Sequence, residues 1–434
     1  MTHLSEQDLQ ALQAIANGAG PRPKFNVAQV AQRIAAENPV AKAYGELHLY
    51  RDGVYRAGGR DIVRSELISI LGEDWRPNRA DAVVTYLYDF APALLETPPV
   101  NLINFKNGIL DWETGKLSEH SPRHLTAVQI PVEYHPDAEC PDTLEFLDQV
   151  LEPDAVEPWL EMVGYFLTPY NGLQMAFMGR GGGGNGKSTA ISQIEALLGP
   201  ANFSSIPLQR LEEDKFAAAQ LGGKLLNTFS DLDARALQSS SIFKSVTGND
   251  SIMCERKYGD AWSQRVFARL LFSANQPPAT SDSSEAFFRR WLIFEFNRTF
   301  KGTKADRNLV ARLTTPEELS GLATEGLKRL PGLLERGAFT VGKSSLEAAE
   351  RFRTDTDTVA GFLAEACGFD IDHRVEKSKL FPAYRDWCLD ANRRPLGKQN
   401  FNRRVQELHP ELSEAVVHGT RFWSGMKLET EAIR

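Results

Sequence analysis

The chain has 434 residues and a formal net charge of −8; 42% of its residues are hydrophobic and 24% are charged. This length predicts two to four domains, and the composition is that of an ordinary soluble globular protein. The acidic balance excludes a generally basic surface for nucleic acid, so any DNA contact must come from local basic clusters or from a pore lining.

Targeting signals are lacking in the sequence. No apolar run reaches the ~18 residues that a membrane span requires. The first residues lack the basic start and apolar stretch of a secretion signal. The four cysteines are far apart and form no CxxC pair, which favours reduced, packed thiols over a zinc site or a disulfide frame. We therefore expect a cytoplasmic protein without a membrane partner.

Turn residues and apolar patterns divide the first part of the chain. Residues 1–40 alternate an alanine-rich helical pattern with turns, residues 47–56 predict a β-hairpin, and residues 61–95 predict helix. After a Pro-Pro pair, residues 101–115 predict short strands with tight turns. Residues 143–167 then predict two amphipathic helices.

The most informative motif lies in residues 178–189, Met-Gly-Arg-Gly-Gly-Gly-Gly-Asn-Gly-Lys-Ser-Thr. It contains Gly-x4-Gly-Lys-Ser, the pattern of the phosphate-binding loop of P-loop NTPases. Glycines let consecutive backbone N–H groups turn inward on an anion. An apolar strand-like run precedes the loop, and a helical pattern over 189–198 follows, so the positive end of that helix faces the phosphates. The alternative is a flexible glycine linker, which the ending Asn-Gly-Lys-Ser-Thr disfavours.

This motif predicts ATP and Mg²⁺ as ligands. Lys187 is expected to reach the β- and γ-phosphates, and Ser188 is expected to hold Mg²⁺. The predicted nucleotide-binding residues are Gly181, Gly184, Asn185, Gly186, Lys187, Ser188 and Thr189.

Hydrolysis also needs an acidic residue at a strand end to hold the metal ion. Residues 225–230 predict a strand that Asp231 follows, and Asp233 is a weaker candidate. Another strand ends before Asn275, whose amide could sense the γ-phosphate or position water. Asp and Asn are also ordinary turn residues. Given the P-loop upstream, we predict that Asp231 is a magnesium ligand and that Asp231 and Asn275 act in catalysis.

Two arginines, Arg289 and Arg290, precede a fourth predicted strand over residues 292–296. An arginine beside a strand edge can stabilise phosphoryl-transfer charge in the active site of a neighbouring subunit. The alternative is an ordinary ion-pairing surface arginine. The tandem pair, in this order after the other motifs, favours the catalytic interpretation for both residues.

The order of these four features resembles a superfamily 3 helicase, a compact AAA+-like ATPase of viruses, phages and plasmids. Within that superfamily the chain is similar to the phage and plasmid primase-helicase branch, which is related to the poxvirus NTPase-primase. Further similarity lies in residues 243–258, 272–278 and 287–291, and upstream in 103–112 and 134–141. Members often carry a long primase-polymerase domain ahead of the helicase; its pattern is not evident here, so we do not expect primer synthesis.

The resemblance implies an α/β, AAA+-like P-loop NTPase core with an N-terminal helical collar region and a C-terminal winged-helix domain. The expected boundaries are an N-terminal region over 1–95, the collar over 96–170, the ATPase core with a helical extension over 171–345, and the winged-helix-like domain over 346–434. It also implies an ATP-dependent DNA helicase of phage, plasmid or mobile-element replication, acting in the host cytoplasm if phage-encoded. Such an enzyme forms a ring, expected to be a hexamer, around single-stranded DNA, and a separate primase or polymerase is a candidate partner.

In the family, a hairpin between the second and third motifs lines the ring pore and grips DNA. The resemblance maps this role to Lys244, Arg256, Lys257 and Tyr258, which supply cations for phosphates and an aromatic ring for a base. The alternative is a surface hairpin with solvated charges. Many members have paired acids at the second motif, but Ser230 precedes Asp231 here, so the catalytic base stays open between Asp231, Asp233 and another acid.

The last 75 residues predict helix, helix, helix and hairpin, an order that suggests a winged-helix fold. The third helix, over residues 398–408, would place Arg403 and Arg404 on DNA phosphates. The alternative is a packing module for subunit or primase contacts.

Three other functions fit parts of this pattern. A replication ATPase could load or recruit partners without unwinding DNA. A small-molecule P-loop kinase would be a monomer whose turnover ignores single-stranded DNA. A binding module with a degenerate site would not depend on Lys187 for turnover.

Overall fold

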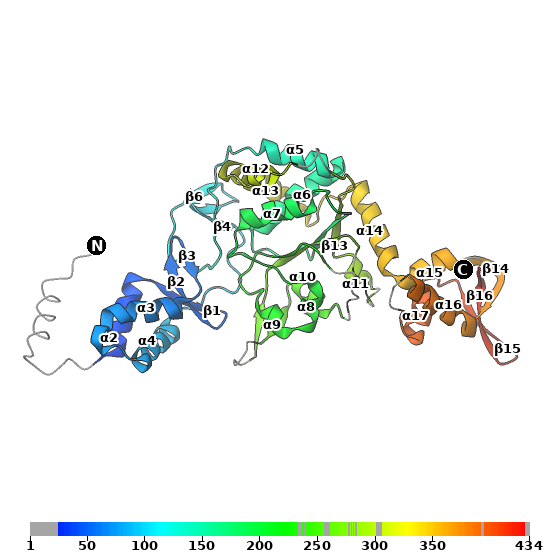
Figure 1. Ribbon diagram of the computed structural model, residues 1–434, viewed down its shortest axis with the longest axis horizontal. Coiled ribbons are helices and arrows are strands. Elements are labelled where there is room, and N and C mark those ends of the chain that lie inside the picture. The colour runs from blue at the N-terminus through cyan, green and yellow to red at the C-terminus, as the bar shows by residue number, and fades with distance from the viewer. Residues whose placement is uncertain are drawn as a thin grey trace, which may run out of the picture. The chain divides into compact units, whose positions relative to one another are not determined.

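The computed structural model describes residues 25–232, 237, 239–255, 261–276, 278, 280, 282, 284–300, 306–391 and 395–429. The chain forms two compact units, Met1–Leu94 and Leu95–Arg434, which Figure 1 colours from blue to red along the sequence. Within the described residues, no helix combines the length and the apolar character needed to cross a membrane. All four cysteines are buried and unpaired with one another, as the sequence predicts.

The first unit contains helices and a small antiparallel sheet of order β1-β2-β3. Asp52 and Gly53 both have positive φ, 51° and 85°, at the turn between β2 and β3, which confirms the predicted hairpin. The elements of this unit are α2 (Val27–Glu37), β1 (Val40–Ala43), β2 (Glu46–Arg51), β3 (Val54–Arg56), α3 (Gly59–Leu71), η1 (Gly72–Asp74) and α4 (Pro77–Phe90).

The second unit begins with a three-stranded antiparallel sheet, β4-β5-β6, and two helices. These elements confirm the strands and helices predicted for residues 101–115 and 143–167. Their bounds are β4 (Leu102–Phe105), β5 (Gly108–Asp111), β6 (Lys116–Ser118), α5 (Pro141–Val150) and α6 (Pro153–Leu167).

A five-stranded sheet of order β13-β7-β12-β9-β8 forms the centre of the second unit. Every neighbouring pair is parallel, which confirms an α/β fold with a parallel sheet. The elements of this region are β7 (Ala176–Arg180), α7 (Lys187–Leu198), β8 (Phe203–Ser204), α8 (Leu208–Glu213), α9 (Lys215–Ala219), β9 (Leu226–Phe229), α10 (Ser241–Thr247), β10 (Ser251–Cys254), β11 (Trp262–Arg265), β12 (Arg269–Ala274), α11 (Glu285–Phe288), β13 (Trp291–Glu295), α12 (Leu309–Leu313), α13 (Pro316–Arg336) and α14 (Lys343–Thr356).

Both faces of this sheet are buried. Phe177 and Leu271 belong to one hydrophobic core, whereas their neighbours Met178 and Phe272 belong to a second one. Successive strand residues point to opposite faces, so the two cores lie on the two sides of the sheet. Figure 1 shows α5, α6, α7 and α13 on one side and α8, α9 and α10 on the other. The runs that form these strands are apolar because neither face meets water.

The C-terminal part of the second unit has its own core, which includes Phe362, Tyr384, Phe401 and Trp423. Its antiparallel sheet has the order β14-β16-β15. The predicted order of three helices and a hairpin omits β14, because most of this strand is exposed and carries no alternating apolar pattern. The bounds are α15 (Thr358–Ala366), β14 (Cys367–Glu376), α16 (Lys377–Asp390), α17 (Lys398–Leu408), β15 (Ser413–Val417) and β16 (Thr420–Leu428).

Candidate nucleotide-binding site

The loop between β7 and α7 has the backbone conformation that its glycines permit. Gly181, Gly184 and Gly186 have φ values of 148°, 72° and 93°, a region that residues with a side chain rarely adopt. A Cβ at Gly181 would lie 2.4 Å from both the Asn185 Nδ2 atom and the Phe296 carbonyl oxygen. Glycine is therefore required at this position for close packing as well as for the turn.

The side chain of Lys187, the first residue of α7, lies inside this loop. The residue is only 7% exposed, and its Nζ atom donates to the carbonyl oxygens of Gly181 and Gly182 and to Oδ1 of Asn185. Burial lowers the pKa of Lys187, and the charge of Asp231 acts in the opposite direction. Asp231 therefore lies within electrostatic reach of the lysine.

The segment after β13 forms hydrogen bonds with the loop. The Asn185 side-chain amide donates to the Phe296 carbonyl at 2.7 Å, and the Phe300 backbone N–H donates to the Gly184 carbonyl at 2.7 Å. These bonds fix the Gly184 carbonyl and give a partner to the buried side-chain amide of Asn185.

The sheet brings Asp231 and Asn275 to the same edge as the loop. Strand β12 lies between β7 and β9; Asn275 follows β12 and Asp231 follows β9 closely. The Leu232 N–H donates to the Ser273 carbonyl at 2.8 Å, and the Ser273 hydroxyl donates to the Ser230 carbonyl. Carboxyl ends of parallel strands share one edge of a sheet, so polar groups that are distant in sequence converge there.

The predicted magnesium ligands are accessible at this edge. Ser188 and Asp231 are exposed, and Thr189 is half-buried. Asp233 lies outside the described residues. Among the residues that the structure describes, no group of three or more His, Cys, Asp and Glu side chains is placed to hold a metal ion. One hydroxyl and one carboxylate fit Mg²⁺, because that ion typically keeps several waters and takes substrate phosphate oxygens.

The two predicted arginines differ in their surroundings. Arg290 is 9% exposed; its Nε atom donates to the Thr247 hydroxyl at 3.0 Å, and its Nη1 atom donates to the Ala286 carbonyl. Arg289 is exposed. The Arg290 guanidinium thus joins α11 to the end of α10 within one protomer, whereas Arg289 faces solvent.

The structure places Lys244 on a helix that precedes the predicted hairpin. It lies on α10, where its Nζ atom pairs with Asp282 and donates to the Ser284 hydroxyl at 3.1 Å. The hairpin itself is β10 paired with β11. Arg256, Lys257 and Tyr258 fall in the sequence between these strands and lie outside the described residues.

The arginines of α17 also differ. Arg404 is 12% exposed at its side chain and pairs with Asp357 at 2.8 Å and with Glu407 at 3.0 Å. Asp357 in turn accepts the N–H groups of the first turn of α15, so Arg404 joins two helices of its own domain. Arg403 is 71% exposed, with a single distant partner, Glu407, at 3.7 Å. Of the two, Arg403 is the side chain available to a phosphate.

The ion pair between Lys244 and Asp282 can be tested through the pKa of Asp282. Burial raises the pKa of Asp282, but hydrogen bonds from Lys244, Ser240 and Ser284 outweigh burial and bring it to about 2 from an ordinary 3.8. A lowered folded-state pKa stabilises the protein above the unfolded value, and this contribution is lost as pH falls from about 4 to about 2.

We expect Asp282→Asn to lower the free energy of unfolding at pH 7 by about 1–3 kcal/mol, measured by urea unfolding. The difference from wild type should shrink below pH ~4. Asp386→Asn, which removes an exposed carboxylate paired with the adjacent Arg385, should change stability by less than ~0.5 kcal/mol. A penalty for Asp282→Asn that stays constant between pH 7 and pH 3 would contradict this role.

Apolar residues next to the loop were missed by sequence reasoning. Phe146 and Val150 of α5 pack against Gly186, and Phe300 is bonded to Gly184. They come from segments far before and far after the P-loop, and apolar residues at such distances carry no motif. No sequence signal marked them.

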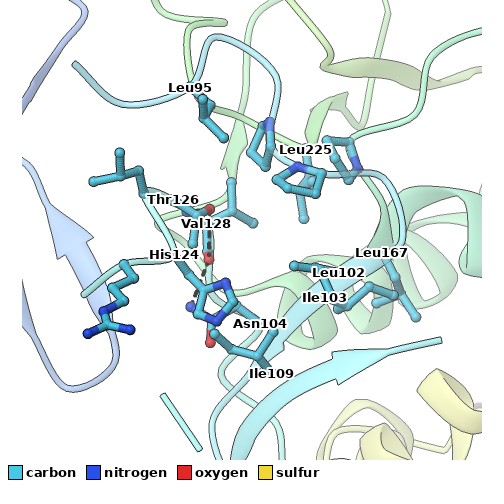
Figure 2. A pocket seen from close by; sticks show the side chains of 15 residues that line it. Leu95, Leu102, Ile103, Asn104, Ile109, His124, Thr126, Val128, Leu167 and Leu225 are labelled. Carbon is cyan, nitrogen blue, oxygen red and sulfur yellow. Dashed lines mark hydrogen bonds between the residues drawn. The ribbon is translucent and has the colours of Figure 1, made fainter. Parts of the chain in front are cut away.

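A separate cavity of about 100 Å³ lies among β4, β5 and the segment after β6. Figure 2 shows that leucine and isoleucine side chains such as Leu102, Ile103 and Ile109 surround it, with His124 beside them. No P-loop residue lines it, and it is well below the ~300 Å³ at which small-molecule sites begin. We assign it no part in nucleotide chemistry.

Comparison with known proteins connects this geometry to a family. Residues 53–152 match the family described as D5 N terminal like, and residues 354–425 match the one described as Poxvirus D5 protein-like. In these two regions the chain is therefore similar to phage-type primase-helicases. Residues 180–290, which contain the P-loop motif, match a family of unknown function (DUF5906). The matches over 53–152 and 354–425 confirm the predicted relationship to phage-type primase-helicases.

Solved structures share the fold of this chain. An A form apo structure of the NrS-1 C-terminal region has 10% identity and a TM-score of 0.52, covering 93% of this chain and 99% of that chain. Another A form apo structure of that region has 11% identity and a TM-score of 0.50, covering 93% of this chain and 100% of that chain.

Proposed function

We propose that the chain is an ATP-driven, ring-forming helicase that translocates on single-stranded DNA during replication of a phage, plasmid or mobile element. The observation that supports this proposal is the order of the parallel strands, which places Lys187, Asp231 and Asn275 after β7, β9 and β12 at the same edge of the sheet, next to the glycine loop. The family relationship supports a role in replication.

In the proposed reaction, the loop N–H groups and Lys187 bind the triphosphate and stabilise negative charge on the β- and γ-phosphates. Ser188 and Asp231 would hold Mg²⁺, which neutralises charge on the phosphate oxygens when bound. Asn275, next to Asp231 at the sheet edge, orients the water for in-line attack. An exposed acid, Asp231 or another, accepts its proton.

The proposed ring follows from Arg289. Its side chain is exposed and would insert at the nucleotide of an adjacent protomer, whereas Arg290 donates to Thr247 in its own protomer. An arginine supplied from a neighbour makes assembly part of the active site. We propose a hexamer, with Arg289 as the inserted residue and Arg290 as the residue that positions it.

The DNA contacts are proposed on two elements. The connection between β10 and β11, with Arg256, Lys257 and Tyr258, would line the pore and hold backbone phosphates and a base. The order α15, β14, α16, α17 and the β15–β16 hairpin supports a winged helix whose α17 presents Arg403. The region between residues 96 and 170 would form the collar.

Replacing Lys257 by alanine tests the helicase proposal. We expect fork unwinding to be lost, because the strand is no longer gripped, while ATP turnover without DNA is retained. Unwinding is measured by release of a labelled strand. Lys343→Ala, at a lysine 88% exposed on α14, is the matched control and should change neither quantity. Unwinding at the wild-type rate by Lys257→Ala would contradict the pore assignment. A wild-type protein that hydrolyses ATP without unwinding any fork would instead favour a partner-loading ATPase.

A further inference from the structure

We propose that a cavity beside the P-loop, between α5 and α12, receives the nucleobase and recognises it by stacking rather than through hydrogen bonds to its edge. The cavity has a volume of about 260 Å³. The inference rests on the proposed function, because it extends the same nucleotide site from the phosphates to the base.

The cavity is continuous with the phosphate-binding loop. Gly184, Gly186 and Thr189 form part of its wall. Asp231 and Asn275, which would face the γ-phosphate and the attacking water, do not line it. A triphosphate that lies on the loop with its γ end toward those two residues therefore directs its other end, the ribose and base, to the cavity.

Aromatic and aliphatic side chains form four of the remaining lining positions. Phe146 and Val150 pack closely against the loop at Gly186. A Cβ at this glycine would lie 2.8 Å from the Val150 Cγ1 atom and 3.3 Å from the Phe146 Cε2 atom. Phe300 is held beside them because its backbone N–H donates to the Gly184 carbonyl at 2.7 Å. Leu309 of α12 also lines the cavity. Such walls suit the flat face of a base.

The size of the cavity fits a base whose phosphates lie outside it. Its volume of about 260 Å³ is near the lower end of the ~300–1,000 Å³ typical of sites that enclose a whole small molecule. The loop takes the triphosphate, so only the base and part of the ribose need enclosure.

Apart from Thr189, which belongs to the loop end of the cavity, the polar side chains that line it have partners within the described part of the chain. Asp306 pairs with Arg312 at 2.9 Å and accepts the Asn308 N–H at 2.8 Å. The Gln149 amide donates to Glu145 at 3.0 Å. A site that reads the base edge would present polar groups directed inward, because such groups give strong discrimination. This arrangement favours stacking, so ATP and GTP should bind alike and CTP more weakly because its base is smaller.

The test compares nucleotides with inorganic tripolyphosphate, which occupies the loop and has no base. Dissociation constants are measured with Mg²⁺ by calorimetry on the full chain. We expect Phe300→Ala to weaken ATP and GTP about tenfold and to leave tripolyphosphate within about twofold of wild type. Phe300→Leu, which retains an apolar side chain but lacks the aromatic face, should weaken ATP several-fold and serves if the alanine variant does not fold. Phe216→Ala, at an exposed phenylalanine of α9 that does not line the cavity, is the control.

Several results would overturn the inference. Equal weakening of ATP and tripolyphosphate by Phe300→Ala would show that Phe300 only supports the loop. Unchanged ATP affinity in both Phe300 variants would place the base elsewhere. GTP binding more than about a hundredfold weaker than ATP binding would indicate edge recognition. Wild-type protein that binds neither ATP nor tripolyphosphate would overturn the nucleotide site itself, a result distinct from the other three.

Discussion

Replacing Lys187 by alanine should abolish ATP hydrolysis, with kcat lowered by about a hundredfold to a thousandfold or more. The ammonium is buried at the centre of the loop, where three oxygen atoms position it. In the proposed reaction its charge would stabilise the β- and γ-phosphates most strongly as negative charge develops on them. Phosphate release from ATP, followed over time with and without single-stranded DNA, gives the rate.

Lys224→Ala is the matched control for this variant. Lys224 is also a lysine whose pKa is lowered by burial, and its Nζ atom donates to the Ala201 carbonyl at 2.6 Å. It is not part of the P-loop, so its loss should affect stability but not the rate per folded molecule. ATP turnover by Lys187→Ala equal to that of wild type would refute the P-loop assignment and favour a degenerate binding module.

Replacing Arg289 by alanine should lower kcat for ATP by about a thousandfold, because an arginine that reaches the transition state from a neighbouring subunit contributes this much or more. The affinity for ATP should change little, since the loop and Lys187 remain. Because Arg289 is exposed, its loss should leave the melting temperature unchanged. Turnover and thermal unfolding are measured on the same preparation.

Arg290→Ala provides the contrast. Its guanidinium is buried and bonded to the Thr247 hydroxyl and the Ala286 carbonyl, so its removal deletes two hydrogen bonds and the packing of a buried side chain. We expect a loss of about 1–3 kcal/mol in the free energy of unfolding, which Arg289→Ala should not show. An unaltered rate in Arg289→Ala, or an equal loss of stability in both variants, would contradict the separate roles.

The central sheet and the P-loop were predictable because their signals are local. A strand that is buried on both faces has a short apolar run as its sequence pattern. The phosphate-binding loop requires a specific motif of glycines followed by lysine and serine. The runs at 225–230, 269–274 and 292–296 correspond to β9, β12 and β13. The shared edge of parallel strands then brings Asp231 and Asn275 together once the order of strands is known.

The remaining features depend on partners that are distant in the sequence. The sequence predicted Lys244 and Arg404 as cations that bind DNA phosphates. In the structure Lys244 forms an ion pair with Asp282, and Arg404 forms one with Asp357. The sequence around Arg289 and Arg290 does not show which side chain is exposed and which is buried. Arg290 donates to Thr247, a residue distant in the sequence, and Arg289 does not. The exposed strand β14 was missed because its pairing with β16, not an apolar pattern, defines it.

The central claim is that Lys187 of one protomer and Arg289 of the next act on the same triphosphate. Co-expressing differently tagged Lys187→Ala and Arg289→Ala chains tests it directly, because each inactive variant retains the residue that the other lacks. Mixed assemblies isolated through both tags should recover about a quarter of the wild-type ATPase rate, since random assembly around a ring completes about one interface in four. Isolated mixed assemblies with no more activity than the two variants show separately would contradict the claim.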